Sequence, residues 1–195
     1  NSSPLPGVIG SAPEAEAFAQ IWQTVTGQSY RNEMSLRIYQ LEAVQPLPKV
    51  NGYLRQATHA DRNLLIDWSK AYIEEAVPEE ANKDVESMVD RQLSEGTLYI
   101  WQDERPVSMA ARIGPTPNGI RINNVYTPPD YRRKGYASAC VAQLSQMLLD
   151  EGRKYCFLFT DLANPTSNHI YQTIGYQPVC DVNSYKFGEK EANCP

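Results

Sequence analysis

The order of secondary-structure patterns in the C-terminal half most strongly constrains how this 195-residue chain can fold. Three strand patterns follow one another with only short polar turns between them, which predicts an antiparallel meander. Two helical patterns then alternate with two further strand patterns, which predicts strand–helix–strand connections. The five strand patterns cover residues 98–102, 107–113, 120–127, 155–160 and 176–187. We therefore expect an α/β (α+β) fold in which helices flank a mixed, mostly antiparallel central sheet.

A short strand and two helices precede this meander. Thr58 and Asp61 have the spacing of a capping box and predict the start of the first of these helices. The strand is expected at 53–57, and the second helix at about 82–93 with its end before Gly96. The apolar face of the first helix consists of Leu64, Leu65, Trp68, Ala71 and Tyr72.

The first 45 residues predict a partial N-terminal lobe of one helix and one strand. A capping box at residues 11–14 starts the helix, Gly27 suits its end, and alternation around Leu36 marks the strand. The helix is expected to bury a face formed by Phe18, Ile21, Trp22 and Val25. One helix and one strand cannot enclose a core, so this lobe must pack on later residues, on sequence upstream of Asn1, or across a homodimer.

A Pro- and Gly-containing linker at 46–52 separates this lobe (1–45) from a second predicted domain at 53–195.

The composition is 42% hydrophobic and 21% charged, which is typical of a soluble globular protein. The net charge of −5 disfavours a nucleic-acid partner. No apolar run approaches the roughly 18 residues of a membrane span, and no signal peptide is visible. We expect neither a membrane nor a nucleic-acid partner.

The cysteines indicate a reducing compartment rather than a metal site. Four cysteines and two histidines show no CxxC or Cys/His spacing, so we expect no metal ion. Cys140 and Cys156 lie in apolar surroundings and are expected to be buried free thiols, which points to a cytoplasmic location.

The stretch YTPPDYRRKGYASA, at 126–139, joins a strand to a helix and has the composition of an anion site. A helix N-terminus presents unpaired backbone amides and a positive dipole end. Gly135 allows a ligand to approach closely, and Ala137 and Ser138 keep the first turn uncluttered. The plainer alternative is a solvated basic turn that caps a helix. Walker A and GxGxxG spacings are absent, so a bound anion would be held in another way.

Arg132-Arg133-Lys134-Gly135-Tyr136-Ala137 resembles the [QR]xxGx[GA] signature of the GCN5-related N-acetyltransferase (GNAT) family. Residues 124–129 resemble the strand end that precedes this signature in the family. The stretch LANPTSNHIYQTIGYQPV, at 162–179, resembles the second family motif. The matching positions of that motif are Asn164, Ser167, Ile170, Tyr171, Gly175 and Tyr176. The resemblance covers about 53–187 and is weak or absent before that.

The resemblance implies acetyl-CoA as co-substrate and assigns roles to several residues. The backbone of a strand end would pair with the pantetheine arm, and one of its amides would polarise the acetyl carbonyl. The amides of the following loop would hold the pyrophosphate. Asn164 and Ser167 would contact pantetheine, although Asn164 is also placed to cap its helix. The strand end is Val125, Tyr126 and Thr127, and the loop is Arg132, Arg133, Lys134, Gly135, Tyr136, Ala137 and Ser138.

Two residues are candidates for proton transfer. A tyrosine phenol is protonated at neutral pH, so Tyr171 is the candidate general acid for the departing thiolate; the alternative is an aromatic that only packs against the sheet. Glu75 follows Trp68 by two helical turns and is a possible base in the region where the family binds its acceptor. A solvated carboxylate at the helix end, with water as the base, is the alternative.

These features predict an N-acetyltransferase that acts on a primary amine of a small molecule or peptide, by direct attack in a ternary complex. Acidic residues in the expected acceptor region weakly favour a cationic acceptor. A catalytically silent acyl-CoA-binding or sensing module is the alternative. The acidic residues are Glu74, Glu75, Glu79, Glu80 and Asp84.

Overall fold

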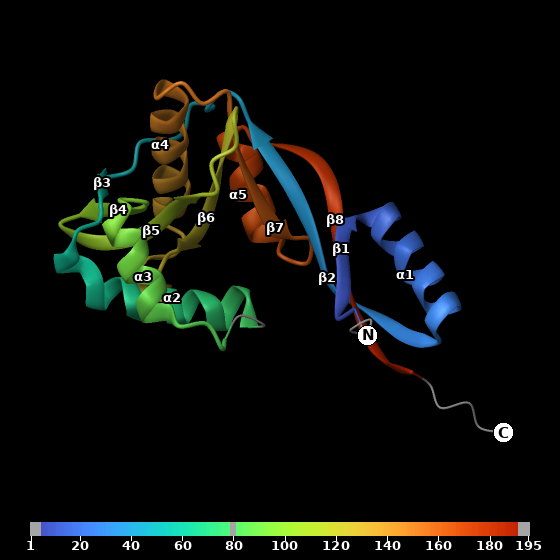
Figure 1. Ribbon diagram of the computed structural model, residues 1–195. Coiled ribbons are helices and arrows are strands. Elements are labelled where there is room, and N and C mark those ends of the chain that lie inside the picture. The colour runs from blue at the N-terminus through green and yellow to red at the C-terminus, as the bar shows by residue number, and fades with distance from the viewer. Residues whose placement is uncertain (1–4, 79–80, 191–195) are drawn as a thin grey trace. The chain divides into compact units, whose positions relative to one another are not determined.

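The computed structural model describes residues 5–78 and 81–190, and these ranges contain eight strands and five α-helices (Figure 1). The elements belong to two compact units. The first unit contains the residues up to Gln40 together with Phe159–His169 and the residues from Gln177 onward. The second unit contains Leu41–Leu158 and Ile170–Tyr176. The fold is mixed α/β, and its strand pairs are mostly antiparallel, as the sequence predicts.

The sheet of the second unit contains the predicted meander. Neighbouring strands pair antiparallel from β3 through β4 and β5 to β6. The start of β7 pairs in parallel with the start of β6, and the intervening helix α4 provides the crossover that a parallel pair requires. The strand bounds are β3 Tyr53–Gln56, β4 Leu98–Asp103, β5 Arg105–Ile113, β6 Gly119–Tyr126 and β7 Tyr155–Asp161.

Helices cover both faces of this sheet (Figure 1). On one face, α2 and α3 pack their apolar side chains against Leu98, Ile100 and Met109 of the sheet. On the other face, α4 packs against β4, β5 and β6 and buries Leu144 and Leu148 completely. The alternation of side chains along each strand therefore supplies two separate apolar layers. The helix bounds are α2 Arg62–Ala76, α3 Val85–Ser94 and α4 Tyr136–Asp150.

The predicted capping box at the start of α2 is confirmed. Thr58 and Asp61 make both of its reciprocal hydrogen bonds, around a short 3-10 turn at His59–Asp61. Asp61 also accepts two hydrogen bonds from the Arg55 guanidinium, at 2.8 and 2.7 Å. The Asp61 side chain is only 11% exposed, so this pair links β3 to the helix start in a largely dry environment.

The first unit is built on the last strand of the chain. β8 (Gln177–Lys190) pairs antiparallel with both β1 (Gly7–Ser11) and β2 (Gln28–Leu41). The sequence predicts only one strand in the N-terminal region, and β1 is additional, because its five residues show no apolar alternation. The predicted division at 45 and 53 assigns β8 to a different domain from β1 and β2. The division into a lobe at 1–45 and a domain at 53–195 stays a prediction.

The predicted buried face of α1 (Ala12–Thr26) is partly wrong. Ile21 and Val25 are 65% and 75% exposed, whereas Ala15 and Ala19 are fully buried beneath Tyr185 and Phe187. Trp22 of the predicted face does pack there, stacked on Phe187. Small alanine side chains allow the helix to approach β8 closely, so the contact stripe is rotated away from the largest apolar residues. The predicted end at Gly27 is confirmed by its left-handed backbone, with φ of 71°.

The buried thiols are also confirmed. Cys140 and Cys156 are free and buried, and burial raises their pKa values to about 12 and about 11. Cys180 is exposed, and Cys194 lies outside the described residues.

We expect Asp61→Asn to lower the free energy of unfolding by about 1.5–3 kcal/mol at pH 7, because it leaves Arg55 without its charged partner. The hydrogen bonds from Arg55 lower the pKa of Asp61. Its contribution is therefore present above the ordinary carboxyl pKa and is lost as the pH falls through the lowered value. Urea unfolding at pH 7 and at about pH 3 measures both effects.

Asp67→Asn, on the exposed side of α2, is the matched control and should change stability little. A deficit in Asp61→Asn that stays constant down to the lower pH would contradict this account.

Candidate functional site

The end of β6 is where the predicted site begins. The register between β5 and β6 shifts beyond the pair Ala111 and Asn123, so β6 contains one extra residue, a β-bulge. Asn124 in this bulge has a positive φ of 52°. After it, the Ser108 hydroxyl lies 3.1 Å from the Tyr126 carbonyl oxygen and 2.8 Å from the Thr127 hydroxyl, which holds the strand end in place.

The loop that follows presents a run of free backbone amides. A 3-10 turn at Pro129–Tyr131 is followed by left-handed backbone at Arg133 (φ 61°) and Gly135 (φ 81°). The first helical hydrogen bond of α4 runs from the Ala139 amide to the Gly135 carbonyl, at 2.9 Å. Among the described residues, the six amides of 133–138 donate to no protein acceptor. They surround the positive end of the α4 dipole, so this loop can bind an anion through its backbone.

The basic side chains of this loop are mostly engaged with the protein. Arg132 donates from Nε to the Thr127 carbonyl at 2.9 Å and from Nη2 to Glu75 at 2.7 Å. Lys134 donates to the Asp130 carbonyl at 3.1 Å. The Arg133 side chain is exposed. Apart from the exposed Arg133 side chain, the groups that the loop leaves free for a ligand are therefore its backbone amides.

A hydrogen bond to a residue outside the predicted site, Asp103, holds the loop. The Tyr136 hydroxyl donates to Asp103 Oδ2 at 2.5 Å, and this hydrogen bond raises the pKa of the tyrosine. Gly135 has a left-handed backbone that side chains rarely adopt, and a Cβ there would also lie close to the Val50 side chain, at 3.0 Å. Sequence reasoning missed Asp103, because the partner is 33 residues away and has no local motif.

The structure places Glu75 beside the loop and the strand end. Its Oε2 accepts from Arg132, and its Oε1 lies 3.4 Å from the Tyr126 hydroxyl. Burial, and then the negative charge of Glu75, raise the pKa of Tyr126. The predicted residues Glu75, Tyr126, Thr127 and Arg132 are therefore brought into one connected cluster, in which the candidate base is already paired with an arginine.

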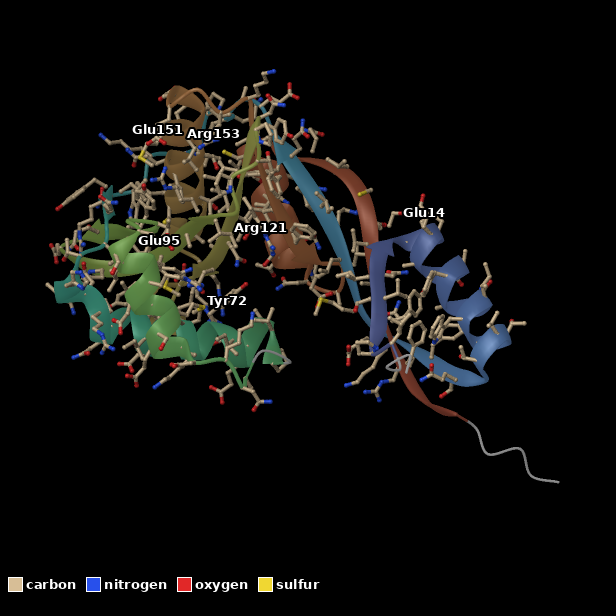
Figure 2. The ribbon with its side chains drawn as sticks, viewed as in Figure 1. Glu14, Tyr72, Glu95, Arg121, Glu151 and Arg153 are labelled. Carbon is tan, nitrogen blue, oxygen red and sulfur yellow. The ribbon has the colours of Figure 1, made fainter. Side chains whose placement is uncertain are left out.

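Tyr171 belongs to α5 (Pro165–Ile174) and is half-buried. Its ring contacts Tyr176 edge-on, at 5.9 Å between centroids. Burial raises its pKa well above the ordinary value, with smaller contributions from Tyr72 of α2 and from Cys140. The phenol therefore stays protonated through neutral pH and beyond, which suits a donor but makes it a weaker acid. Figure 2 shows Tyr72 on α2.

Asn164 and Ser167 form the start of α5 within the first unit. Asn164 Oδ1 accepts a hydrogen bond from the backbone amide of Ser167 at 3.0 Å, so the predicted role of Asn164 as a helix cap is confirmed. The Asn164 carbonyl also accepts from the Asn168 side chain at 2.8 Å. The roles in pantetheine binding stay predictions.

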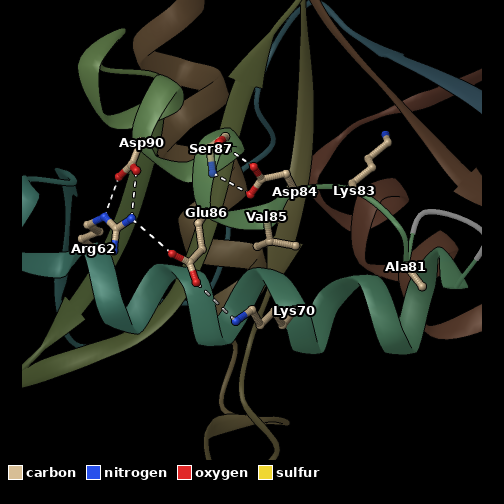
Figure 3. Close-up of a pocket in the computed structure, with 9 residues that line it drawn as sticks. All are labelled: Arg62, Lys70, Ala81, Lys83, Asp84, Val85, Glu86, Ser87 and Asp90. Atoms are coloured by element: carbon tan, nitrogen blue, oxygen red, sulfur yellow. Dashed lines mark hydrogen bonds and ion pairs between the residues drawn. The ribbon is translucent and has the colours of Figure 1, made fainter.

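A surface pocket of about 550 Å³ is lined by residues of α2, of α3 and of the segment that joins them (Figure 3). Its charged groups are paired with one another: Arg62 donates twice to Asp90, and Glu86 lies 3.6 Å from Arg62 and 4.0 Å from Lys70. None of the predicted catalytic or donor-binding residues lines it, whereas Asp84 of the expected acceptor region does. We assign this pocket no role in the chemistry, because four of its charged side chains are held in ion pairs with one another and none of its lining residues belongs to the α4 loop or to the end of β6.

The described residues contain no group of three or more His, Cys, Asp or Glu side chains that could hold a metal ion. Within the same ranges, no helix is both long and apolar enough to cross a membrane.

Comparison with known proteins identifies the family of this chain. The profile of a family described as the acetyltransferase (GNAT) family matches residues 62–176, which is more than half of the chain. The chain belongs to this family, whose members transfer an acetyl group from acetyl-CoA. A search of curated proteins finds no match.

Solved structures share the fold at low sequence identity. A GNAT-family acetyltransferase from Colwellia psychrerythraea has a TM-score of 0.68 at 11% identity, over 95% of this chain and 65% of that one. A GCN5-related N-acetyltransferase from Sphaerobacter thermophilus has a TM-score of 0.67 at 16% identity, over 97% of this chain and 62% of that one. A putative acetyltransferase of the GNAT family from Novosphingobium aromaticivorans DSM 12444 has a TM-score of 0.57 at 18% identity, over 93% of this chain and 83% of that one. The chain thus spans slightly under two thirds of the length of the first two.

We expect Gly135→Ala to weaken binding of CoA by about 10-fold or more, because the added Cβ strains the left-handed backbone that aims the free amides. Gly152→Ala is the matched control. Gly152 follows the other end of α4 and has a φ of 93°, but nothing lies within 4 Å of its Cβ position. Calorimetric titration with CoA should show a loss for Gly135→Ala only. Equal affinities for the two variants would argue against the loop as the anion site.

Proposed function

We propose that this protein transfers the acetyl group of acetyl-CoA to a primary amine of a small molecule or peptide, by direct attack in a ternary complex. The observation that carries the proposal is the run of six free amides at 133–138, at the N-terminus of α4. A diphosphate is an anion with several acceptor oxygens, and such a run of amides can satisfy them without a metal ion or a fixed cation.

Donor positioning follows from the strand end. The backbone of residues 125–127 would pair with the pantetheine arm, and an amide near Tyr126 or Thr127 would polarise the acetyl carbonyl. The Ser108 hydroxyl and the Arg132 guanidinium already hold the carbonyl oxygens of Tyr126 and Thr127. A fixed backbone costs little reorganisation when negative charge develops on the acetyl oxygen, which supports this assignment.

In the reaction, the amine nitrogen forms a bond to the acetyl carbon and the carbon–sulfur bond breaks, while the nitrogen loses a proton and the sulfur leaves as a thiolate. We assign Tyr171 to the sulfur, as the proposed general acid. A free thiol has a pKa of about 8.5, whereas the Tyr171 pKa is raised, so complete proton transfer is unfavourable. A strong hydrogen bond from the phenol to the developing thiolate is the main contribution we expect from this residue.

Glu75 is the proposed base for the amine proton, either directly or through water. Its exposed position next to Tyr126 gives it access to solvent, and its ion pair with Arg132 links it to the donor loop. Of the acidic residues expected near the acceptor, Glu74 is exposed and Asp84 instead caps α3 by accepting from Ser87. Glu79 and Glu80 lie outside the described residues.

Screening primary amines for the release of free thiol from acetyl-CoA tests the proposed function. Amine-dependent release supports it. Tight CoA binding without turnover of any amine would instead favour a silent acyl-CoA-binding module.

Tyr171→Phe should lower kcat by about 10–100-fold and leave the dissociation constant of acetyl-CoA nearly unchanged, because the hydroxyl acts only as the sulfur leaves. Tyr155→Phe removes a hydroxyl from a half-buried tyrosine on β7 and serves as the control. Steady-state kinetics together with titration of acetyl-CoA separate the two effects. An unchanged kcat in Tyr171→Phe would remove this residue from the mechanism.

Glu75→Gln should lower kcat by about 10-fold or more, because the amide accepts no proton. Glu74→Gln changes the neighbouring exposed carboxylate and should leave kcat unchanged. If both variants keep the kcat of the wild type, the base is water or another group.

A further inference from the structure

Asn124 carries a polar atom that the folded protein does not satisfy. Its side chain is 4% exposed, and its Oδ1 is buried without a hydrogen-bond partner. The Nδ2 of the same amide donates to the Ser69 hydroxyl at 3.4 Å. A buried carbonyl oxygen without a partner costs about 1–3 kcal/mol in folding stability, so such atoms call for an explanation.

The surroundings of this amide belong to the donor site and to α2. Asn124 precedes Val125 directly, and it lies in the bulge that ends the regular pairing of β6 with β5. Ser69 is a fully buried polar residue on the face of α2 that packs against β6. From the same helix, Trp68 contacts the Tyr126 ring at 6.4 Å, and Glu75 reaches the Tyr126 hydroxyl.

We propose that Asn124 Oδ1 accepts a hydrogen bond from the N–H of the acceptor amine and positions its nitrogen for attack. The inference rests on the proposed function and names a substrate-positioning residue for it. A neutral primary amine has two N–H groups and one lone pair. When one N–H is bound by the carbonyl oxygen, the lone pair is free to point toward a thioester held along 125–127. The unpaired Oδ1 of Asn124 would therefore gain its hydrogen-bond partner only when the amine substrate is bound.

The backbone offers a competing explanation, which the experiment must separate from this one. Asparagine is among the few residues that tolerate left-handed backbone, so the φ of 52° would by itself explain an asparagine at position 124. Glycine tolerates this backbone even better but has no oxygen. Aspartate keeps an oxygen at the same place. Asn124→Gly and Asn124→Asp therefore separate the role of the carbonyl from that of the backbone.

The experiment measures KM for the best amine of the thiol-release screen, kcat, and the dissociation constant of acetyl-CoA. We expect Asn124→Gly to raise KM for the amine by about 10-fold or more and to leave acetyl-CoA binding unchanged. Asn124→Asp should restore KM to within about threefold of wild type, since it keeps the acceptor oxygen. Asn123→Gly, which places a glycine at the adjacent half-buried position of β6, should have the KM of wild type.

A wild-type KM in Asn124→Gly would overturn the inference, because the backbone alone would then explain the residue. An equal rise of KM in Asn124→Gly and Asn124→Asp would also overturn it, by showing a role in shape only. Either result leaves the proposed function standing. Absence of amine turnover in the wild-type protein would overturn the proposed function and this inference together.

Discussion

The free amides at 133–138 are the constraint on which the rest of the site depends. Helix starts are commonly capped by a side chain, yet α4 begins after a glycine that provides none. Left-handed backbone at Arg133 and Gly135 aims the amides outward, and the Tyr136–Asp103 hydrogen bond ties the loop to the β4–β5 turn. These contacts hold the start of α4 in place while its first backbone N–H groups keep no hydrogen-bond acceptor. Such an arrangement is expected where a bound ligand supplies the acceptors.

Arg132 connects the proposed anion site to the proposed chemistry. Its guanidinium donates hydrogen bonds to the Thr127 carbonyl at the end of β6 and to the carboxylate of Glu75. This one side chain therefore links the loop before α4 and the end of β6 to the candidate base. Because both charges are more than 40% exposed, the ion pair contributes little to stability, and a phosphate can compete with Glu75 for Arg132 at small cost. Donor binding and the freedom of Glu75 are thereby coupled in the proposed mechanism.

Sequence periodicity predicted the second unit well and the first unit poorly. The meander, the capping box at Thr58 and the helix after Gly135 depend on local backbone preferences, which neighbouring residues determine. The missed strand β1 and the exposed Ile21 and Val25 depend on β8, more than 150 residues later in the chain. The small side chains of Ala15 and Ala19 let α1 approach β8 closely, and this close approach determines which face of the helix is buried. The most apolar face of the helix is therefore not the buried one.

The sequence by itself determined the loop, its glycine, the Asn164 cap and the family to which the chain belongs, because each is a pattern of residues close together in the chain. Only the tertiary structure decided which groups are already paired and which are left over. Arg132 meets a carboxylate 57 residues away, and burial weakens the acidity of Tyr171. The fold also turns Asn124 from one of two asparagines in a strand into a buried amide with a free oxygen. Such outcomes depend on solvent exclusion and on partners distant in sequence, which no local pattern encodes.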